Sequence, residues 1–302
     1  MSLFTKLFRF SQWFIAYRRQ KPFSVPFDAS GFQIIRPPSG HFFADPFIFE
    51  NDGKNYIFFE DYIAIKDKGV ISFVELDGQG RCSSPQVVLE RPYHLSYPFL
   101  FRVEGRIYLI PETAENRTVE LYAADNFPYG WRFVKTLLAG RRTVDATVYP
   151  HAGKLWLFAT VLADDDRYGT GELYLYQADD ILADWRPHPA NPVSTDLADS
   201  RPAGGIFAAN GSLIRPSQHF GERYGAAVVF NEIVALTEQA YRERKLTEVG
   251  SEWRENNEAF HTYNRNGWFE VVDGAMVRTD WLKAPRRAVS LPYRWFTRTS
   301  HY

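Results

Sequence analysis

Residues 41–61 read HFFADPFIFENDGKNYIFFED, and this stretch contains the unit from which the whole chain is built. An apolar run at 47–49 is followed by a turn at 51–53 and by a second apolar run at 55–60. The turn needs positive φ, which Gly53 adopts without steric cost, so the stretch predicts a β-hairpin. Asp45 stands just before the first strand of this hairpin.

The same unit returns along the chain at nearly regular intervals. Each copy has an aromatic residue four positions before a glycine, and successive copies are 52, 48, 58 and 56 residues apart. β-Rich units that repeat about every 50 residues are typical of a β-propeller with one unit per blade. The aromatic and glycine pairs are Phe49/Gly53, Phe101/Gly105, Tyr149/Gly153, Phe207/Gly211 and Tyr263/Gly267.

We therefore predict an all-β fold, a five-bladed β-propeller over residues 28–302 with a short N-terminal helix before it. The fifth unit is short of strand-like runs, and propellers commonly close their ring with a strand from the other end of the chain. We expect residues 31–37 (GFQIIRP) to supply that strand. The expected blades cover approximately residues 36–90, 91–140, 141–195, 196–250 and 251–285.

Residues 1–27 carry five basic residues and no acidic one, and their apolar residues recur at helical spacing. The pattern predicts a basic amphipathic helix, which either lies on an anionic membrane surface or packs across one end of the propeller. The segment lacks the unbroken apolar core of a secretory signal, and its apolar run is too short to span a bilayer. We therefore expect a cytoplasmic protein that is either free or peripheral at the inner membrane.

The composition excludes several classes of function. The formal net charge of −1 argues against a nucleic-acid partner, because such proteins carry a basic excess. A single cysteine, Cys82, cannot form an internal disulfide and fits a reducing compartment. The chain has no glycine-rich phosphate loop, zinc-spaced Cys/His set or Gly-x-Ser-x-Gly elbow, so we expect no cofactor and no required metal, although clustered carboxylates could hold Ca²⁺.

Polar residues at strand ends indicate where a site could form. In a propeller the innermost strands begin near the axis, so residues distant in sequence converge there. Carboxyl groups that share one polar cavity can be driven to different pKa values, as the acid and base of glycosidic-bond chemistry require. We predict catalytic roles for Asp45, Asp145 and Glu112. The expected substrate-binding residues are Arg36, Glu60, Ser96, Tyr97, Arg201, Arg215, Gln218 and His261.

The arginines in this set allow a prediction about the charge of the ligand. Arg36, Arg201 and Arg215 stand at strand starts or ends that should border the axis. Guanidinium groups bind phosphates and carboxylates through two parallel hydrogen bonds, so several of them at one site indicate an activated or acidic sugar. The alternative for each arginine is a salt bridge between neighbouring blades.

The motif ADP at 44–46, followed by an aromatic strand and an Asp-Gly turn, resembles the first-blade motif of glycoside hydrolase family 43 and its five-bladed relatives. In that family an Asp of the first blade is the general base, a second Asp tunes the acid, and a Glu from a later blade is the acid. The resemblance implies Asp45 as the base. Blade two has SYP at 96–98 instead of the second Asp-Pro, so Asp145 and Glu112 would take the other two roles out of the family's order.

A second set of phrases extends over residues 41–267. It includes FFADPFIFE (42–50), PYHLSYPFLF (92–101), VDATVY (144–149), SRPAGGIF (200–207) and HTYNRNG (261–267). Together they are similar to the N-terminal β-propeller domain of plant glucosamine inositolphosphorylceramide transferases and their bacterial counterparts. The resemblance implies a role in glycoconjugate metabolism. It implies no reaction, because the glycosyltransferase chemistry of the plant proteins is attributed to a different domain.

The expected function is glycosyl transfer from a phosphate-activated sugar during synthesis of a cell-surface glycan or glycolipid, with Asp45 as general base. The expected partners are a carbohydrate or activated-sugar ligand and a membrane surface or glycolipid acceptor. Two alternatives stay open. One is an inverting glycoside hydrolase of the family 43 type, and the other is a non-catalytic glycan-binding propeller.

Overall fold

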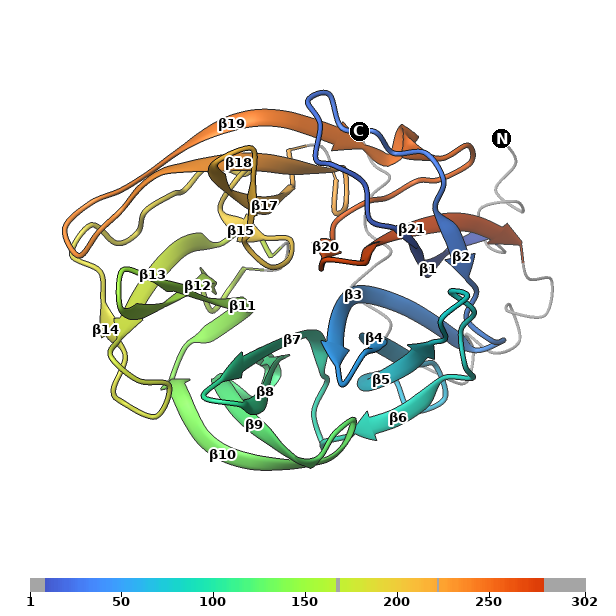
Figure 1. Cartoon of the computed structure of the whole chain (residues 1–302), viewed down its shortest axis with the longest axis horizontal. Helices are drawn as coiled ribbons and strands as arrows, with labels where there is room; N and C mark the ends of the chain where they lie inside the picture. The colour runs from blue at the N-terminus through green and yellow to red at the C-terminus, as the bar shows by residue number, and fades with distance from the viewer. Residues whose placement is uncertain (1–8, 167–168, 222, 280–302) are drawn as a thin grey trace.

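The computed structural model describes residues 9–166, 169–221 and 223–279. Its strands form antiparallel sheets that follow one another around a central axis (Figure 1). The prediction of an all-β, five-bladed propeller is confirmed. Helical structure within the described residues is limited to two short 3-10 turns, η1 (Ala114–Asn116) and η2 (Ser251–Trp253). None of the described helices has the length and apolarity needed to span a membrane.

Blades one to three are four-stranded meanders that run outward from the axis. Blade one contains β3 (His41–Asn51), β4 (Lys54–Ile63), β5 (Lys68–Leu76) and β6 (Gln86–Leu89). Blade two contains β7 (Ser96–Val103), β8 (Arg106–Thr113), β9 (Thr118–Asn126) and β10 (Tyr129–Ala139). Blade three contains β11 (Arg142–His151), β12 (Lys154–Leu162), β13 (Glu172–Ala178) and β14 (Arg186–Pro187).

The last two blades depart from this plan. In blade four the inner edge is divided between β15 (Arg201–Pro202) and β16 (Phe207–Ala209), which both pair with β17 (Ser212–His219). β18 (Ala227–Leu236) and β19 (Tyr241–Gly250) complete it. Blade five joins both ends of the described chain, in the order β20 (Tyr263–Arg265), β21 (Phe269–Thr279), β1 (Arg9–Arg19) and β2 (Gln33–Ile35).

The prediction of an N-terminal helix is wrong for residues 9–19, which form β1; residues 1–8 lie outside the described part. β1 pairs with β21 along its whole length, from Arg9 opposite Thr279 to Arg19 opposite Phe269. Residues 13–17 are buried without alternation, because other parts of the protein cover both faces of this strand. A strand that is buried on both faces reads as a continuous apolar run, which periodicity alone cannot distinguish from a helix.

Ring closure therefore uses two N-terminal strands. β2 falls within residues 31–37, where we expected the closing strand. It pairs with β1 at the outer edge of the blade and does not pair with β21. β1 makes the longer connection, since it is the strand that pairs with β21.

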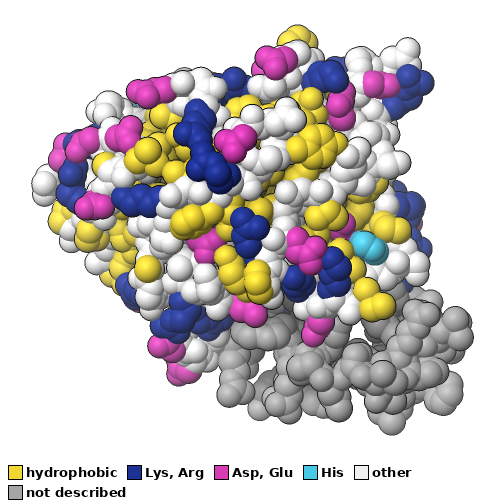
Figure 2. All heavy atoms as spheres, turned by 90° about the horizontal axis from the view of Figure 1, so that it is seen from below, with side chains coloured by type: hydrophobic (Ala, Val, Ile, Leu, Met, Phe, Trp, Pro, Cys, Tyr) yellow, Lys and Arg dark blue, Asp and Glu magenta, His cyan; other side chains and the backbone are white. Residues whose placement is uncertain are grey.

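Apolar side chains fill the spaces between neighbouring blades. The largest cluster joins blades one, two and three, and includes Phe58, Leu109 and Leu157. Another joins blades four and five around Phe230 and Tyr263. On the outer side of the ring, where β6 and β10 lie, basic and acidic side chains are intermixed with apolar ones (Figure 2). The numerous aromatic residues thus serve mainly to pack blades together.

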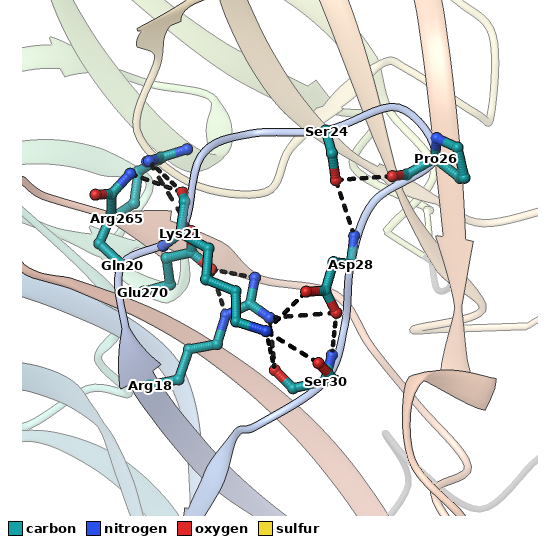
Figure 3. A network of polar contacts seen from close by, with 9 residues as sticks. All are labelled: Arg18, Gln20, Lys21, Ser24, Pro26, Asp28, Ser30, Arg265 and Glu270. Carbon is teal, nitrogen blue, oxygen red and sulfur yellow. Dashed lines mark hydrogen bonds and ion pairs between the residues drawn. The ribbon is translucent and has the colours of Figure 1, made fainter.

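A polar network holds the segment between β1 and β2 (Figure 3). The Arg18 guanidinium donates through Nε to Glu270 Oε2 (2.6 Å) and through Nη1 to the Ser30 carbonyl (2.6 Å). Lys21 Nζ donates to Asp28 Oδ2 (2.7 Å). Arg18 and Glu270 are both buried, so their charges compensate each other inside blade five.

Candidate active site at the propeller axis

The same backbone bulge occurs in the inner strands of blades one, two and three. Strand register shifts after Ala44, Ser96 and Val144, and the next residue is left-handed each time: Asp45, Tyr97 and Asp145 have φ of 50°, 41° and 53°. These three residues are the ones four positions before the repeated aromatic. Non-glycine residues adopt this conformation at a cost of roughly 1–2 kcal/mol, which the surrounding contacts must offset.

Asp45 is buried and fully engaged. Its Oδ1 accepts a hydrogen bond from the Thr262 hydroxyl (2.9 Å) and lies 3.3 Å from His261 Nε2, and its Oδ2 accepts from the Tyr97 amide (3.2 Å). Burial raises the pKa of Asp45 to about 7, although the charge of His261 acts in the opposite direction. Burial thus makes the Asp45 carboxyl a weaker acid than it would be in water.

Asp273 of β21 ties blade five to blade one. Its Oδ1 accepts the amides of His261 and Thr262 (3.0 Å each), and its Oδ2 accepts the amide of Asp45 (3.2 Å). His261 Nδ1 lies 2.6 Å from the same Oδ2. Burial opposes a charge on His261, but Asp273 and Asp45 outweigh it and raise the pKa of His261 to about 9.

Asp45, His261 and Asp273 also form a group whose ligand atoms lie within 4.8 Å of one another, which suits a metal ion geometrically. Binding there would need a neutral imidazole, because a protonated ring nitrogen cannot ligate a metal. The raised pKa of His261 favours the imidazolium. The imidazolium lies between the Asp45 and Asp273 carboxyl groups, and a metal ion bound there would have to displace its proton.

A second group of charged residues at the axis surrounds Arg201; together with the group around Asp45 it forms what we call the centre. Its guanidinium contacts Asp145 through Nε, and Nη2 lies 3.8 Å from Glu112 Oε2. Gln218 Nε2 donates to Asp145 Oδ2 (2.9 Å). Burial raises the pKa of Glu112, and the carboxyl of Asp145 raises it further, while Arg201 and His94 lower it. Glu112 thus favours the protonated form near neutral pH.

The charged side chains at the axis differ in their exposure to solvent. Those of Glu112 and Arg201 are 15% and 11% exposed, whereas those of Asp45 and Asp145 are 7% and 2% exposed. Glu112 and Arg201 are therefore more accessible than Asp45 and Asp145, and His94 is more accessible still, at 33%.

Aromatic rings connect the two halves. The Tyr224 ring lies 5.0 Å from the His261 ring, and the Arg201 guanidinium lies 5.7 Å from Tyr224 and 5.2 Å from Phe220. Trp13, from β1, lies 4.4 Å from His261. Charged groups and aromatic rings thus pack against one another at the axis.

His94 and Glu60 form the blade-one edge of the centre. Nε2 of His94 lies 3.2 Å from Glu60 Oε1, and Nδ1 accepts a hydrogen bond from the Gly69 amide (3.0 Å). Because Nδ1 accepts, the ring N–H is on Nε2, which faces Glu60. A Cβ at Gly69 would lie 2.3 Å from the Leu95 carbonyl oxygen and 2.9 Å from the His94 ring. Glycine at this position therefore allows His94 to approach β5.

Comparison with known proteins assigns the family. Residues 30–281 match the family model described as glucosamine inositolphosphorylceramide transferase 1, N-terminal. The chain belongs to this family. The Arabidopsis thaliana glucosamine inositolphosphorylceramide transferase 1 is 33% identical over 206 residues, which are 67% of this chain and 27% of that protein. The Oryza sativa subsp. japonica protein is 30% identical over 253 residues, 78% and 34% respectively. This chain thus spans about a third of its curated relatives' length.

Solved structures agree on the fold of this family member. A family 62 α-L-arabinofuranosidase of Coprinopsis cinerea has a TM-score of 0.60 at 13% identity, covering 87% of this chain and 97% of that one. A family 117 glycoside hydrolase of Zobellia galactanivorans has a TM-score of 0.55 at 14% identity, covering 90% and 91%. A family 43 protein of Bacillus licheniformis has a TM-score of 0.53 at 13% identity, covering 77% and 53%. Identities this low show the fold alone.

Two of the arginines that we expected at the axis of this family member lie elsewhere. Arg215 is buried inside blade four, where it donates to Glu243 (2.6 and 2.8 Å) and to the Asp199 carbonyl (2.7 Å). Arg36 is exposed beside blade five. Strand position decides both outcomes: Arg215 is in the middle of β17 and Arg36 follows the outer strand β2, so neither can reach the axis.

Tyr97 and Ser96 reach the centre differently from what we expected. The Tyr97 ring is buried between blades, and its hydroxyl is 2.9 Å from the Thr147 hydroxyl, so only its amide contacts Asp45. Ser96 is buried opposite Glu112 in the β7–β8 ladder. The structure brings together the remaining predicted residues: Asp45, Glu60, Glu112, Asp145, Arg201, Gln218 and His261.

Sequence reasoning missed Asp273, Thr262, His94, Tyr224 and Trp13. For Asp273 a signal existed. Glu60, Glu112 and Gln218 each stand seven positions after the repeated glycine of their unit. Each pairs with a residue near the start of the innermost strand of its blade. Asp273 is six positions after Gly267. The other four depend on contacts between blades and leave no such pattern.

Proposed function

We propose that this propeller acts on a glycosyl unit of a glycolipid or another cell-surface glycan, with Glu112 as general acid and Asp45 as general base. One observation carries the proposal: carboxyl groups from four blades (Asp45, Glu112, Asp145 and Asp273) meet at the axis in two differently bonded environments. Burial raises the pKa of both Asp45 and Glu112 towards neutrality, where acid–base catalysis is most effective. The plant relatives that share this domain are named as transferases, so transfer to an acceptor hydroxyl is tested together with hydrolysis.

In the proposed reaction Glu112 gives its proton to the oxygen of the leaving group as the bond to the anomeric carbon breaks. Asp45 accepts the proton of the acceptor hydroxyl as the new bond to that carbon forms. His261 and Thr262 stabilise the ionised form of Asp45, and Arg201 pairs with Asp145 beside Glu112. The negative charge of Asp145 keeps the proton on Glu112 until the leaving group needs it.

The expected phosphate-activated donor finds limited support in the charges at the axis. Among the described residues, Arg201 is the arginine at the axis. It is already paired with Asp145 and close to Glu112. A phosphate would have to compete with these carboxylates for one guanidinium. The centre suits a neutral or positively charged sugar better than an anionic one.

Hydrolysis is the second candidate, because the same protonated Glu112 and ionisable Asp45 would serve a water molecule equally well. In that case Asp45 activates water in place of the acceptor hydroxyl. The alternative to both is a non-catalytic glycan-binding propeller, which would bind a sugar without turnover.

The test uses the full chain with Asp45→Asn and Glu112→Gln. Binding of a monosaccharide panel is measured by saturation-transfer NMR, and turnover is measured with nucleotide-sugar donors and with p-nitrophenyl glycosides. We expect each variant to bind its sugar but to lose about 10²–10⁴ in turnover. Asp184→Asn, whose carboxylate is fully exposed in blade three, is the matched control and keeps full activity. Sugar binding without turnover in the wild-type protein would leave a binding module, and no binding would end the proposal.

A further inference from the structure

We propose that the seam between blades four and five binds a small monovalent anion, of the size of chloride, between the Arg265 guanidinium and the Tyr263 hydroxyl. Both residues belong to β20 and stand two positions apart, so their side chains lie on the same face of that strand. Arg265 Nη1 and the Tyr263 hydroxyl oxygen are buried, and neither has a hydrogen-bond partner among the described residues. Two buried donors on one face of a strand therefore lack an acceptor.

A row of three charged side chains crosses the sheet of blade five at this point. Strand register places Arg265 of β20 opposite Glu270 of β21, and Glu270 opposite Arg18 of β1. The side chains of Arg265, Glu270 and Arg18 are 11%, 1% and 4% exposed. Arginine stays protonated in proteins, so two positive charges share one carboxylate and the row is positive overall.

The carboxylate of Glu270 is already occupied by other donors. Its Oε2 accepts from Arg18 Nε (2.6 Å), and its Oε1 accepts from the Lys21 amide (3.2 Å). Arg265 Nη2 lies 3.9 Å from Oε1, beyond hydrogen-bonding distance, and donates instead to the Lys21 carbonyl (3.0 Å). Figure 3 shows Asp28 separated from Arg265 by Lys21, with which Asp28 pairs at 2.7 Å. Among the described residues, no carboxylate thus lies at hydrogen-bonding distance from Arg265.

Aromatic rings surround the two donors. The Arg265 guanidinium lies 5.2 Å from the centre of the Phe207 ring, and the Tyr263 ring lies 5.7 Å from Phe207 and 5.4 Å from Phe27. A ring face offsets part of a positive charge, but a buried charge without a counter-charge remains costly. An anion would accept from both donors and neutralise the row, whereas a water molecule would leave the charge. Two donors suit an ion of one atom, because a phosphate has several acceptor oxygens and would need more donors.

Other buried nitrogens without a partner differ from this pair. Arg215 has one, but its guanidinium already forms two hydrogen bonds with Glu243. Trp253 and Arg254 each have one, but they are consecutive residues at the end of η2, and neither residue is buried as a whole. At β20 the positive charge, the second donor and the shared strand face occur together.

Thermal unfolding of the full chain tests the anion site. A ligand that binds only the folded protein raises the melting temperature by mass action. We expect the melting temperature to rise saturably with sodium chloride and with sodium bromide, compared with sodium gluconate at the same ionic strength. In crystals grown with bromide, the anomalous signal should show a peak within hydrogen-bonding distance of Arg265 Nη1 and the Tyr263 hydroxyl.

Two variants remove the donors separately. Tyr263→Phe should weaken chloride binding roughly tenfold, since a hydrogen bond to a charged group contributes about 1.5–3 kcal/mol. Arg265→Met should abolish the chloride response. Tyr129→Phe and Arg244→Met remove the same groups from positions that are 42% and 68% exposed, and should respond to chloride like the wild-type protein.

Three results would overturn the proposal. Equal stabilisation by chloride and gluconate would show an effect of ionic strength alone. A Tyr263→Phe variant that loses the same stability in both salts would assign the hydroxyl to a water molecule, and this comparison holds even where Arg265→Met does not fold. Stabilisation by phosphate but not by chloride or bromide would contradict a monovalent ion. All these measurements are made without turnover, so they stand whether or not the centre is catalytic.

Discussion

Asp45 illustrates how a buried charge is supported at the scale of single residues. It accepts two hydrogen bonds, from Thr262 and from Tyr97, and it faces the ring of His261. A buried carboxylate needs such partners because transfer out of water is otherwise costly. His261 in turn lies between Asp45 and Asp273, so the charge of each group depends on the others.

The first prediction concerns the pKa of His261. Asp45→Asn removes one of the two carboxylates that raise this pKa, while burial continues to lower it. We expect the pKa of His261 to fall below its wild-type value of about 9. A pH titration of the histidine ring resonances by NMR measures the change, and the signals of His151, on the β11–β12 turn, should stay the same. An unchanged His261 titration would contradict the pairing.

The second prediction concerns Arg201. Removing its guanidinium in Arg201→Ala leaves the carboxylates of Asp145 and Glu112 without their cation in a buried site. We expect the free energy of unfolding to fall by about 3–5 kcal/mol. Arg244→Ala breaks a pair in which the arginine is 68% exposed, and should cost less than about 1 kcal/mol. Urea unfolding of both variants measures the difference, and equal costs would refute it.

At the scale of elements, β1 has the largest consequence for the fold. It lies between β2 and β21, so that Ala16 is opposite Ile34 on one side and Val272 on the other. It also brings Trp13 to His261 at the propeller axis. The strand that closes the ring therefore also contributes to the site.

The third prediction tests β1 with a proline. Ala16→Pro removes an amide from a strand that is paired on both sides, and should lower the free energy of unfolding by at least about 1–3 kcal/mol. Ala16→Gly keeps the amide and should cost about 1 kcal/mol or less. Urea unfolding followed by tryptophan fluorescence gives both values. A proline variant as stable as the glycine variant would show that residues 9–19 are not a central strand.

At the scale of the whole molecule, the groups at the axis whose pKa values are raised on folding all make the protein less stable as pH rises. The pKa of Asp45 rises from 3.8 to about 7 on folding, and the pKa of Glu112 rises as well. The folded protein therefore binds these protons more tightly than the unfolded chain. Their contribution to stability is complete below the unfolded pKa and is lost as pH rises through the folded one. His261, raised to about 9, adds a loss of the same sign at higher pH.

The fourth prediction follows from this balance. Between about pH 5 and pH 9 the free energy of unfolding should decrease, with a limiting slope of about 1.4 kcal/mol per pH unit for each proton lost. Carboxylates with lowered pKa, such as Glu232, stay ionised in this range and do not change the slope. Urea unfolding at several pH values measures it, and the double variant Asp45→Asn with Glu112→Gln should show a shallower dependence. A stability that increases over this range would be the opposite result.

The sequence by itself determined the number of blades and the positions of Asp45 and Asp145, because these depend on local turn chemistry that repeats with the same spacing in each unit. It also led to Glu112, Arg201 and Gln218, which occupy strand ends near the axis. Only the tertiary structure decided that residues 9–19 form a strand, since burial on both faces erases the period that distinguishes strand from helix. It also decided which charges are present at the axis, because Arg201 pairs with Asp145 there and Arg215 pairs with Glu243 inside blade four. Charges cancel through distances in space, and no spacing along the chain records those distances.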